Sequence, residues 1–259
     1  MSTTVRNVRP RTPMDRDRKT ALVAGVLYLI TFAGSLPALP LYHDILHDHR
    51  YILGNASGTG VRVSALLELI CALAGIGTAV VLFRVVKRYS EALALGFIAA
   101  RVFEAAMIGV GVISVLSIVT LQHDSAGGSA ADANSLVTAG RSLVALHDWT
   151  FLLGPGFMPA VSALCLGTVL YRSRLVPRVI PMLGLIGAPL LAASGVATLF
   201  GGYDQLSAMG AAAGFPIAAW ELSLGVWLVV KGFKPTAIAA SADPSTVGDR
   251  EAELTPAVA

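Results

Sequence analysis

The chain contains six apolar runs that are each long enough to cross a lipid bilayer. At a helical rise of about 1.5 Å per residue, about 20 apolar residues cover a hydrocarbon layer about 30 Å thick. Lipid offers no partner to backbone N–H and C=O groups, so runs of this kind fold as helices. The sequence therefore predicts an all-α fold, an integral membrane bundle of six transmembrane helices over about residues 20–39, 63–83, 92–121, 148–171, 179–200 and 210–230.

The composition agrees with a membrane protein. Charged residues make up 14% of the chain and hydrophobic residues 55%, whereas a soluble domain carries about a quarter charged residues. The net charge of +3 is too small to indicate nucleic acid binding. Cys71 and Cys165 both lie inside apolar runs, so we expect buried thiols rather than a disulfide. The sequence has no Walker or G-x-S-x-G motif, and we expect no cofactor.

The basic residues are distributed unevenly among the segments between the runs. Fifteen of the 19 Lys and Arg residues lie in the two terminal segments and in the second and fourth connections, and only three lie in the other connections. Cytoplasmic segments carry the excess of Lys and Arg, so the bias predicts that both termini are cytoplasmic. We predict disordered tails at 1–19 and 235–259, and outer loops at 40–62, 122–147 and 201–209.

The remaining arginine, Arg101, lies inside the third run, about 14 Å deep at the helical rise. Glu104 follows at i+3 on the same helical face, and Glu221 reaches a similar depth in the sixth run. Glu68 lies nearer the outer end of the second run. A charge at the membrane centre costs at least about 2.5–3.5 kcal/mol. We therefore expect these four side chains to face the bundle interior as a candidate buried polar site.

The charges of this group do not balance, because three carboxylates share one guanidinium. Arg101 can pair with one carboxylate or be shared by two. At least one carboxyl is then expected to be protonated, hydrated or bound to a cation. Two interpretations stay open: the group binds a solute or relays a proton, or it only fixes helix packing and register.

His147 and Asp148 open the fourth run at the expected outer interface. A structural role accounts for this position, because Asp148 suits a helix N-terminus and the adjacent Trp149 suits the aromatic belt of a membrane protein. The alternative is that His147 and Asp148 line the outer mouth of a cavity that contains the charged group.

The first outer loop carries three histidines. His43 and His47 are spaced to share one helical face, and with Asp48 and His49 they could hold zinc. The glutamate of an H-E-x-x-H motif is absent. A solvated polar loop is the alternative, and we assign no metal to these histidines.

Several short motifs follow one another in a recognisable order along the chain. They are AGVLYL at 24–29, RVFEA at 101–105, LHD at 146–148, the region around Gly154, LYRSRLVPR at 170–178, WE at 220–221, GVWL at 225–228 and KGF at 231–233. This set, over about residues 18–234, resembles the domain-of-unknown-function 4386 family of prokaryotic polytopic membrane proteins. The resemblance implies a six-span protein in a prokaryotic cell membrane. The family has no established activity, so no catalytic residues are implied.

These observations favour a multi-pass membrane protein that handles a small solute or protons through its buried Arg and Glu side chains. The expected partners are the lipid bilayer and that solute or proton, and the sequence identifies no protein partner. One alternative is a structural or accessory membrane protein in which the charged group only fixes helix packing. Another is an intramembrane metal-dependent hydrolase that uses His147, Asp148 and the outer-loop histidines. The sequence leans towards a protein that is not an enzyme.

Overall fold

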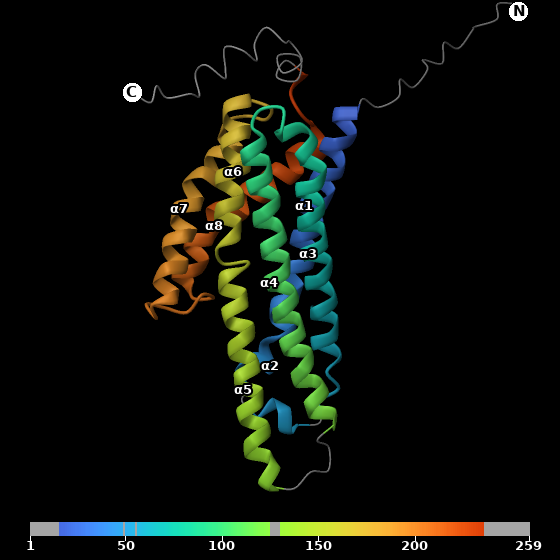
Figure 1. The fold of residues 1–259 in the computed structure, drawn as a ribbon, viewed down its shortest axis with the longest axis vertical. Helices are drawn as coiled ribbons and strands as arrows, with labels where there is room; N and C mark the ends of the chain where they lie inside the picture. Colours follow the sequence, from blue (N-terminus) through green and yellow to red (C-terminus); the bar gives the residue numbers. More distant parts are fainter. Residues whose placement is uncertain (1–15, 49, 55, 125–129, 236–259) are drawn as a thin grey trace, which may run out of the picture.

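The computed structural model describes residues 16–48, 50–54, 56–124 and 130–235, and the elements in this part of the chain are all helical (Figure 1). They are α1 (Arg16–Leu41), α2 (His43–His47), the short 3-10 helix η1 (Tyr51–Leu53), α3 (Thr59–Val86), α4 (Glu91–Asp124), α5 (Ala130–Leu153), α6 (Met158–Ser173), α7 (Val179–Leu199) and α8 (Ala208–Val230). Six stretches are long and apolar enough to span a membrane, and α5 and α6 together form one of them. The predicted all-α, six-span fold is confirmed.

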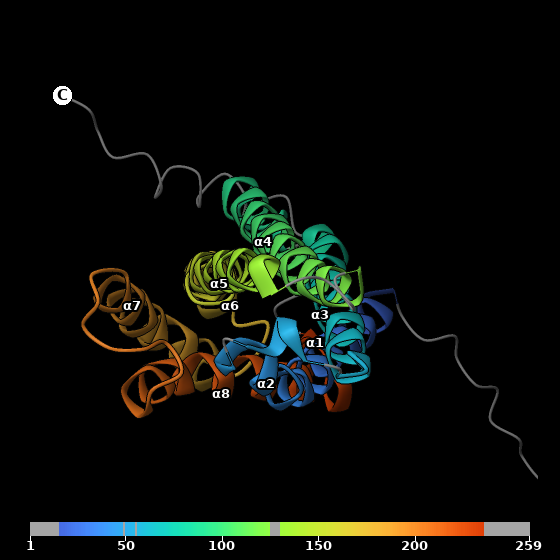
Figure 2. The same cartoon turned by 90° about the horizontal axis from the view of Figure 1, so that it is seen from below.

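The six spans form a closed ring in which each packs on two neighbours. The order around the ring is α1, α3, α4, the α5–α6 pair, α7 and α8, which returns to α1. Figure 2 shows this arrangement from one end of the bundle, with α2 lying across that end. Because α4 and α8 lie on opposite sides of the ring, only long side chains can connect them across its centre.

Buried apolar side chains fill the ring at the end near the termini. The largest are Tyr28, Phe97 and Trp220, which belong to three different spans. At this end α1 and α8 approach closely through glycines: a Cβ on Gly25 would lie 2.7 Å from the Gly225 carbonyl oxygen. Gly25 is therefore a position where even one methyl group forces the two backbones apart.

Helix α1 begins earlier than the sequence predicts, within the segment expected to be a disordered tail. It starts at Arg16 rather than near residue 20. The Arg18 guanidinium donates to the carbonyl oxygens of Leu228 and Val229 at 2.8 and 2.6 Å. These carbonyls lie at the C-terminal end of α8, where they have no intrahelical partner, so Arg18 satisfies them and orders the start of α1. The remaining tail predictions, for 1–15 and 236–259, lie outside the described residues.

The predicted outer loop at 122–147 is wrong over most of its length. Helix α5 begins at Ala130 and continues to Leu153, and α4 extends to Asp124. Val137 and Val144 of α5 pack on a second apolar group, which includes Tyr42, Ile52 and Ile118. This packing stabilises a helix whose start is rich in Ala and small polar residues and is typical of a loop. The expected flexible stretch from Ser125 falls in part outside the described residues.

The short elements α2 and η1 lie within the predicted loop at 40–62 and cover the end of the ring opposite the termini (Figures 1 and 2). Ile45 of α2 and Ile52 of η1 are buried beneath them, against α4. The polar surface of this segment therefore rests on an apolar base that belongs to the bundle.

The chain turns irregular between α5 and α6, where the sequence reads Gly154-Pro155-Gly156. Pro155 has no N–H to donate, and Gly156 N–H donates to the Phe151 carbonyl oxygen at 2.9 Å. A Cβ on Gly154 would lie 2.6 Å from Met107 Cβ of α4. The break therefore sits directly against α4, one turn from Glu104.

Candidate functional site

Arg101 stands at the centre of the charged group and is 4% exposed. Its Nη1 lies 3.0 Å from Glu104 Oε2, on the same face of α4, and its Nη2 contacts Glu221 Oε1 of α8. The guanidinium also lies 5.6 Å from the centroid of the Tyr28 ring and 5.8 Å from that of Phe97. Two carboxylates and two aromatic faces thus surround one cation, as expected for a buried arginine.

The Arg101 side chain is a bridge across the ring. Glu104 belongs to its own helix, but Glu221 belongs to α8, which does not pack along α4. The ion pair therefore joins two spans that neighbouring helices otherwise hold apart. Removing one member would leave a partner charge buried, which costs more than an intact pair contributes.

A cavity of about 300 Å³ lies inside the ring beside this bridge. Its charged wall is formed by Glu68, Arg101, Glu104 and Glu221, which come from α3, α4 and α8. The rest of the lining is mainly apolar and includes Phe32, Leu36, Leu39, Ile108, Phe151, Pro155, Pro159, Leu191 and Ile217. A concave, mostly apolar space with a few convergent polar groups is the usual form of a small-molecule site.

Glu68 is the third carboxylate of the cavity, and its partner is a phenol rather than a cation. The Tyr42 hydroxyl donates to Glu68 Oε2 at 3.1 Å. Burial and the adjacent Glu68 carboxylate raise the pKa of Tyr42, which keeps the phenol protonated as a donor. Within the described part of the chain, no Lys, Arg or His nitrogen lies within 4.0 Å of the Glu68 carboxylate.

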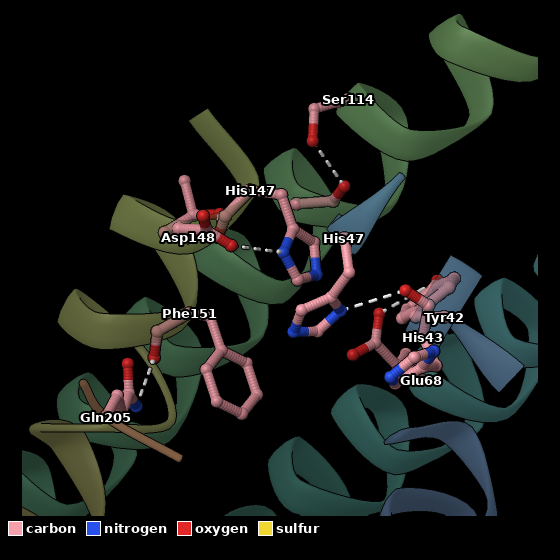
Figure 3. Close-up of polar contacts among 11 residues, drawn as sticks. Tyr42, His43, His47, Glu68, Ser114, His147, Asp148, Phe151 and Gln205 are labelled. Atoms are coloured by element: carbon pink, nitrogen blue, oxygen red, sulfur yellow. Dashed lines mark hydrogen bonds and ion pairs between the residues drawn. The ribbon is translucent and has the colours of Figure 1, made fainter. Parts of the chain in front are cut away.

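His147 lies one layer further from the charged group, beside Glu68 and Phe151 in a small void of about 10 Å³. The residue is 5% exposed. Its ring packs edge-on against the Tyr42 ring, with 5.6 Å between the centroids. Asp148 is 3.4 Å from His147 Nδ1, and 63% of its side chain is exposed. Figure 3 shows Asp148 and Glu68 on opposite sides of the His147 ring.

The two residues proposed for the outer mouth therefore have different surroundings. His147 lines the small void beside Glu68, whereas the Asp148 side chain is largely exposed, and neither residue lines the cavity of about 300 Å³. The expectation that Asp148 lies at a helix N-terminus is wrong, because α5 begins eighteen residues earlier, at Ala130.

The outer-loop histidines do not join this site. His43 and His47 lie on α2 with their rings stacked 4.6 Å apart between centroids. His43 Nδ1 contacts Asp44 at 3.3 Å, and His47 Nδ1 contacts the His43 carbonyl oxygen at 2.9 Å (Figure 3). His49 lies outside the described residues. Among the residues that the structure describes, no group of three or more His, Cys, Asp or Glu side chains could hold a metal ion.

The sequence predicts the charged residues of the site but not the aromatic ones. Tyr28 is fully buried over Arg101, and Tyr42 is the partner of Glu68. Tyr28 falls in the AGVLYL motif at 24–29, but nothing in that motif identifies the arginine as its neighbour. Tyr42 falls in the predicted outer loop at 40–62, and only the packing of α2 brings it to Glu68.

A family model described as "Domain of unknown function (DUF4386)" matches residues 23–232. Neither a curated protein nor a solved structure matches the chain. The match covers the first span from Val23, the other five spans in full and every charged residue of the cavity.

Proposed function

The chain belongs to the DUF4386 family, whose description names no activity, and from its site we propose that it is a cell-membrane protein that binds a small solute, or moves protons, within the cavity. The observation that carries this proposal is the cavity of about 300 Å³ beside Arg101, Glu104, Glu221 and Glu68. Protein interiors are close-packed, and an unfilled space lowers stability. If the charged group only fixed helix packing, a cavity beside it would lower stability without any benefit.

The same proposal places both termini in the cytoplasm of a prokaryote. The support is the distribution of Lys and Arg, with fifteen of the 19 on the side of the termini. Under this orientation α2 and η1 cover the outer end of the ring, and His147 lies between the outside and Glu68.

The test is a flux measurement on protein reconstituted in liposomes that carry a pH indicator. The proposal predicts proton or solute-coupled pH movement above that of protein-free liposomes. Glu68→Gln is expected to reduce it by about tenfold or more, because the exchangeable carboxyl is lost. Glu91→Gln is the matched control, since Glu91 is exposed at the start of α4. The proposal fails if the wild type shows no flux and neither Arg101→Gln nor Glu104→Gln alters anything except stability.

A second candidate function, that of a structural or accessory membrane protein, is favoured by one observation. Arg101 joins α4 to α8, which do not pack along each other. A charge swap, Arg101→Glu with Glu104→Arg, separates two forms of this idea. Rescue of folding by the swap indicates a pair that acts alone, and failure indicates that Glu221 is a necessary third member. The arrangement of the histidines does not favour a metal-dependent hydrolase.

A further inference from the structure

The outer half of the cavity lies between α1 and α8, which are in close contact nearer the termini. Gly25 of α1 and Gly225 of α8 are in contact, and the helices run in opposite directions. Residues 31–39 of α1 therefore lie level with about 211–219 of α8. These are the stretches that line the cavity, for example through Leu36 and Leu39 of α1 and through Gly214 and Ala218 of α8. The α1–α8 seam is closed at Gly25 and Gly225, and beyond Thr31 both helices line the cavity.

Residues along this open seam are exposed on the outside of the bundle as well as lining the cavity. Leu36 is 63% exposed, Leu39 is 41% exposed, and Ser35 and Ala218 are also exposed. Ala218 lies about 15 Å along α8 from its first residue, near the middle of a membrane-spanning helix. The cavity therefore opens sideways at the depth of the lipid hydrocarbon.

The charge inside the cavity selects what can enter through this opening. Arg101 is already shared by Glu104 and Glu221, whereas Glu68 has a phenol as its partner. A carboxylate with spare acceptor sites in an apolar cavity favours a ligand that brings positive charge and N–H donors. The apolar lining formed by Phe32, Leu36 and Leu39 favours a ligand with a hydrocarbon or aromatic body.

We propose that the cavity takes an organic ammonium ion, an amine with a small apolar body, which enters from the bilayer between α1 and α8 and places its ammonium group at Glu68. This inference rests on the proposed function and names the ligand class of the same site. The three observations that carry it are the lateral opening, the mixed lining of the cavity and a carboxylate whose hydrogen-bond partner is a phenol.

The experiment uses the full chain in lipid nanodiscs and three probes of one size: benzylamine, benzyl alcohol and benzoate. Equilibrium dialysis measures retention at pH 7, and empty nanodiscs measure partition into lipid alone. We expect saturable retention of benzylamine that is at least about tenfold tighter than that of the other two probes. Glu68→Gln is expected to weaken benzylamine binding by about tenfold, and Glu91→Gln to leave it unchanged.

A second variant keeps the test decisive if Glu68→Gln folds poorly. Gly214→Phe places a ring in the cavity, where a Cβ on Gly214 meets no atom within 4 Å, and it is expected to abolish benzylamine retention. Equal retention of benzylamine and benzyl alcohol overturns the inference, and so does unchanged benzylamine affinity in well-folded Glu68→Gln. After either of these two results, the proposed function still holds if Gly214→Phe abolishes retention of benzylamine. Absence of saturable binding by all three probes also overturns the inference, and the liposome flux then decides the proposed function separately.

Discussion

Among the four charged residues of the cavity, the glutamates differ in what they neutralise. Glu221 and Glu104 both contact the Arg101 guanidinium, whereas Glu68 accepts a hydrogen bond from Tyr42. A carboxylate that pairs with a buried cation stabilises the fold, because its loss leaves that cation short of a partner. A buried carboxylate without a cation has no such effect and carries a desolvation cost. The residues should therefore respond differently to the same substitution.

We predict that Glu221→Gln lowers the free energy of unfolding by about 1–3 kcal/mol, since the amide oxygen can still accept from Arg101 but no longer neutralises its buried charge. Glu68→Gln should leave the free energy of unfolding unchanged or raise it, because the amide oxygen can still accept from Tyr42. Unfolding in an SDS titration measures both. Equal losses in the two variants would contradict the assignment of Glu68 as the carboxylate that is bonded to Tyr42 rather than to Arg101.

The sequence predicts much of this group, since the depth of each charge in its apolar run can be counted from the run's ends. Depth alone places Arg101, Glu104 and Glu221 at similar levels. Because a charge exposed to lipid is costly, these side chains are expected to face the bundle interior. The sequence does not reveal Tyr42 as a partner of Glu68, because that contact depends on how the segment after α1 folds over the bundle.

At the scale of elements, the α1–α8 seam sets the shape of the cavity. Its closed part depends on Gly25, whose missing side chain lets the α8 backbone approach. Small residues at such positions let transmembrane helices pack closely. The position of the closed part cannot be read from the sequence alone, because the chain has 26 glycines and only their three-dimensional neighbours show which of them matter.

We predict that Gly25→Leu destabilises the protein by about 1–3 kcal/mol or more, because the new side chain overlaps Gly225 and Val229. Gly109→Leu is the matched control, since a Cβ there meets nothing within 4 Å, and it should change the free energy of unfolding by less than about 0.5 kcal/mol. Thermal unfolding in detergent compares the two. Similar losses at both positions would rule out a close glycine contact between α1 and α8.

Helix α5 lies largely where the sequence predicts an outer loop, at 122–147. Its first half carries Ser, Thr, Asn and Asp at a density that is typical of a loop. Its apolar residues form only one stripe, which packs on α2, η1 and α4. Helices of this kind are stabilised by tertiary contacts rather than by intrinsic propensity.

Hydrogen exchange should therefore show slow exchange at the backbone amides of residues 137–147, because they are bonded within α5. Residues 203–206, between α7 and α8, are a suitable internal reference for fast exchange, since they lie outside any helix and between the hydrogen-bonded amides of Gly202 and Ser207. Mass spectrometry of deuterated peptides in detergent measures both segments. Exchange at 137–147 as fast as in the reference segment would show that this part of the chain is a loop.

For the whole molecule, the distribution of Lys and Arg predicts which end faces the cytoplasm. Ser173 lies at the end of α6 near the termini, and Ser57 lies at the opposite end, between η1 and α3. Each is exchanged for Cys in a protein that carries Cys71→Ser and Cys165→Ser. In intact cells, a membrane-impermeant maleimide should label Ser57→Cys and leave Ser173→Cys unlabelled. The reverse pattern would invert the orientation.

The ring of spans and the cavity inside it differ in how far sequence predicts them. Six spans follow from six apolar runs, because the bilayer fixes helix length. The cavity follows from a balance of side-chain volumes among six helices. Pro155 and Pro159, at the α5–α6 break, line it, and Pro216 lies in α8 next to the lining residue Ile217. No local pattern in the sequence encodes that balance.

The central claim is that the charged group borders an open cavity rather than a closed scaffold, and Cys71 tests it directly because its side chain lines that space. In protein that carries Cys165→Ser, a small uncharged thiol reagent should label Cys71 in the folded, membrane-embedded state, and Gly214→Phe should slow the labelling by about tenfold. Labelling that occurs only after denaturation, or at the same rate in Gly214→Phe, would contradict an open cavity and leave the Arg101 bridge as a structural element alone.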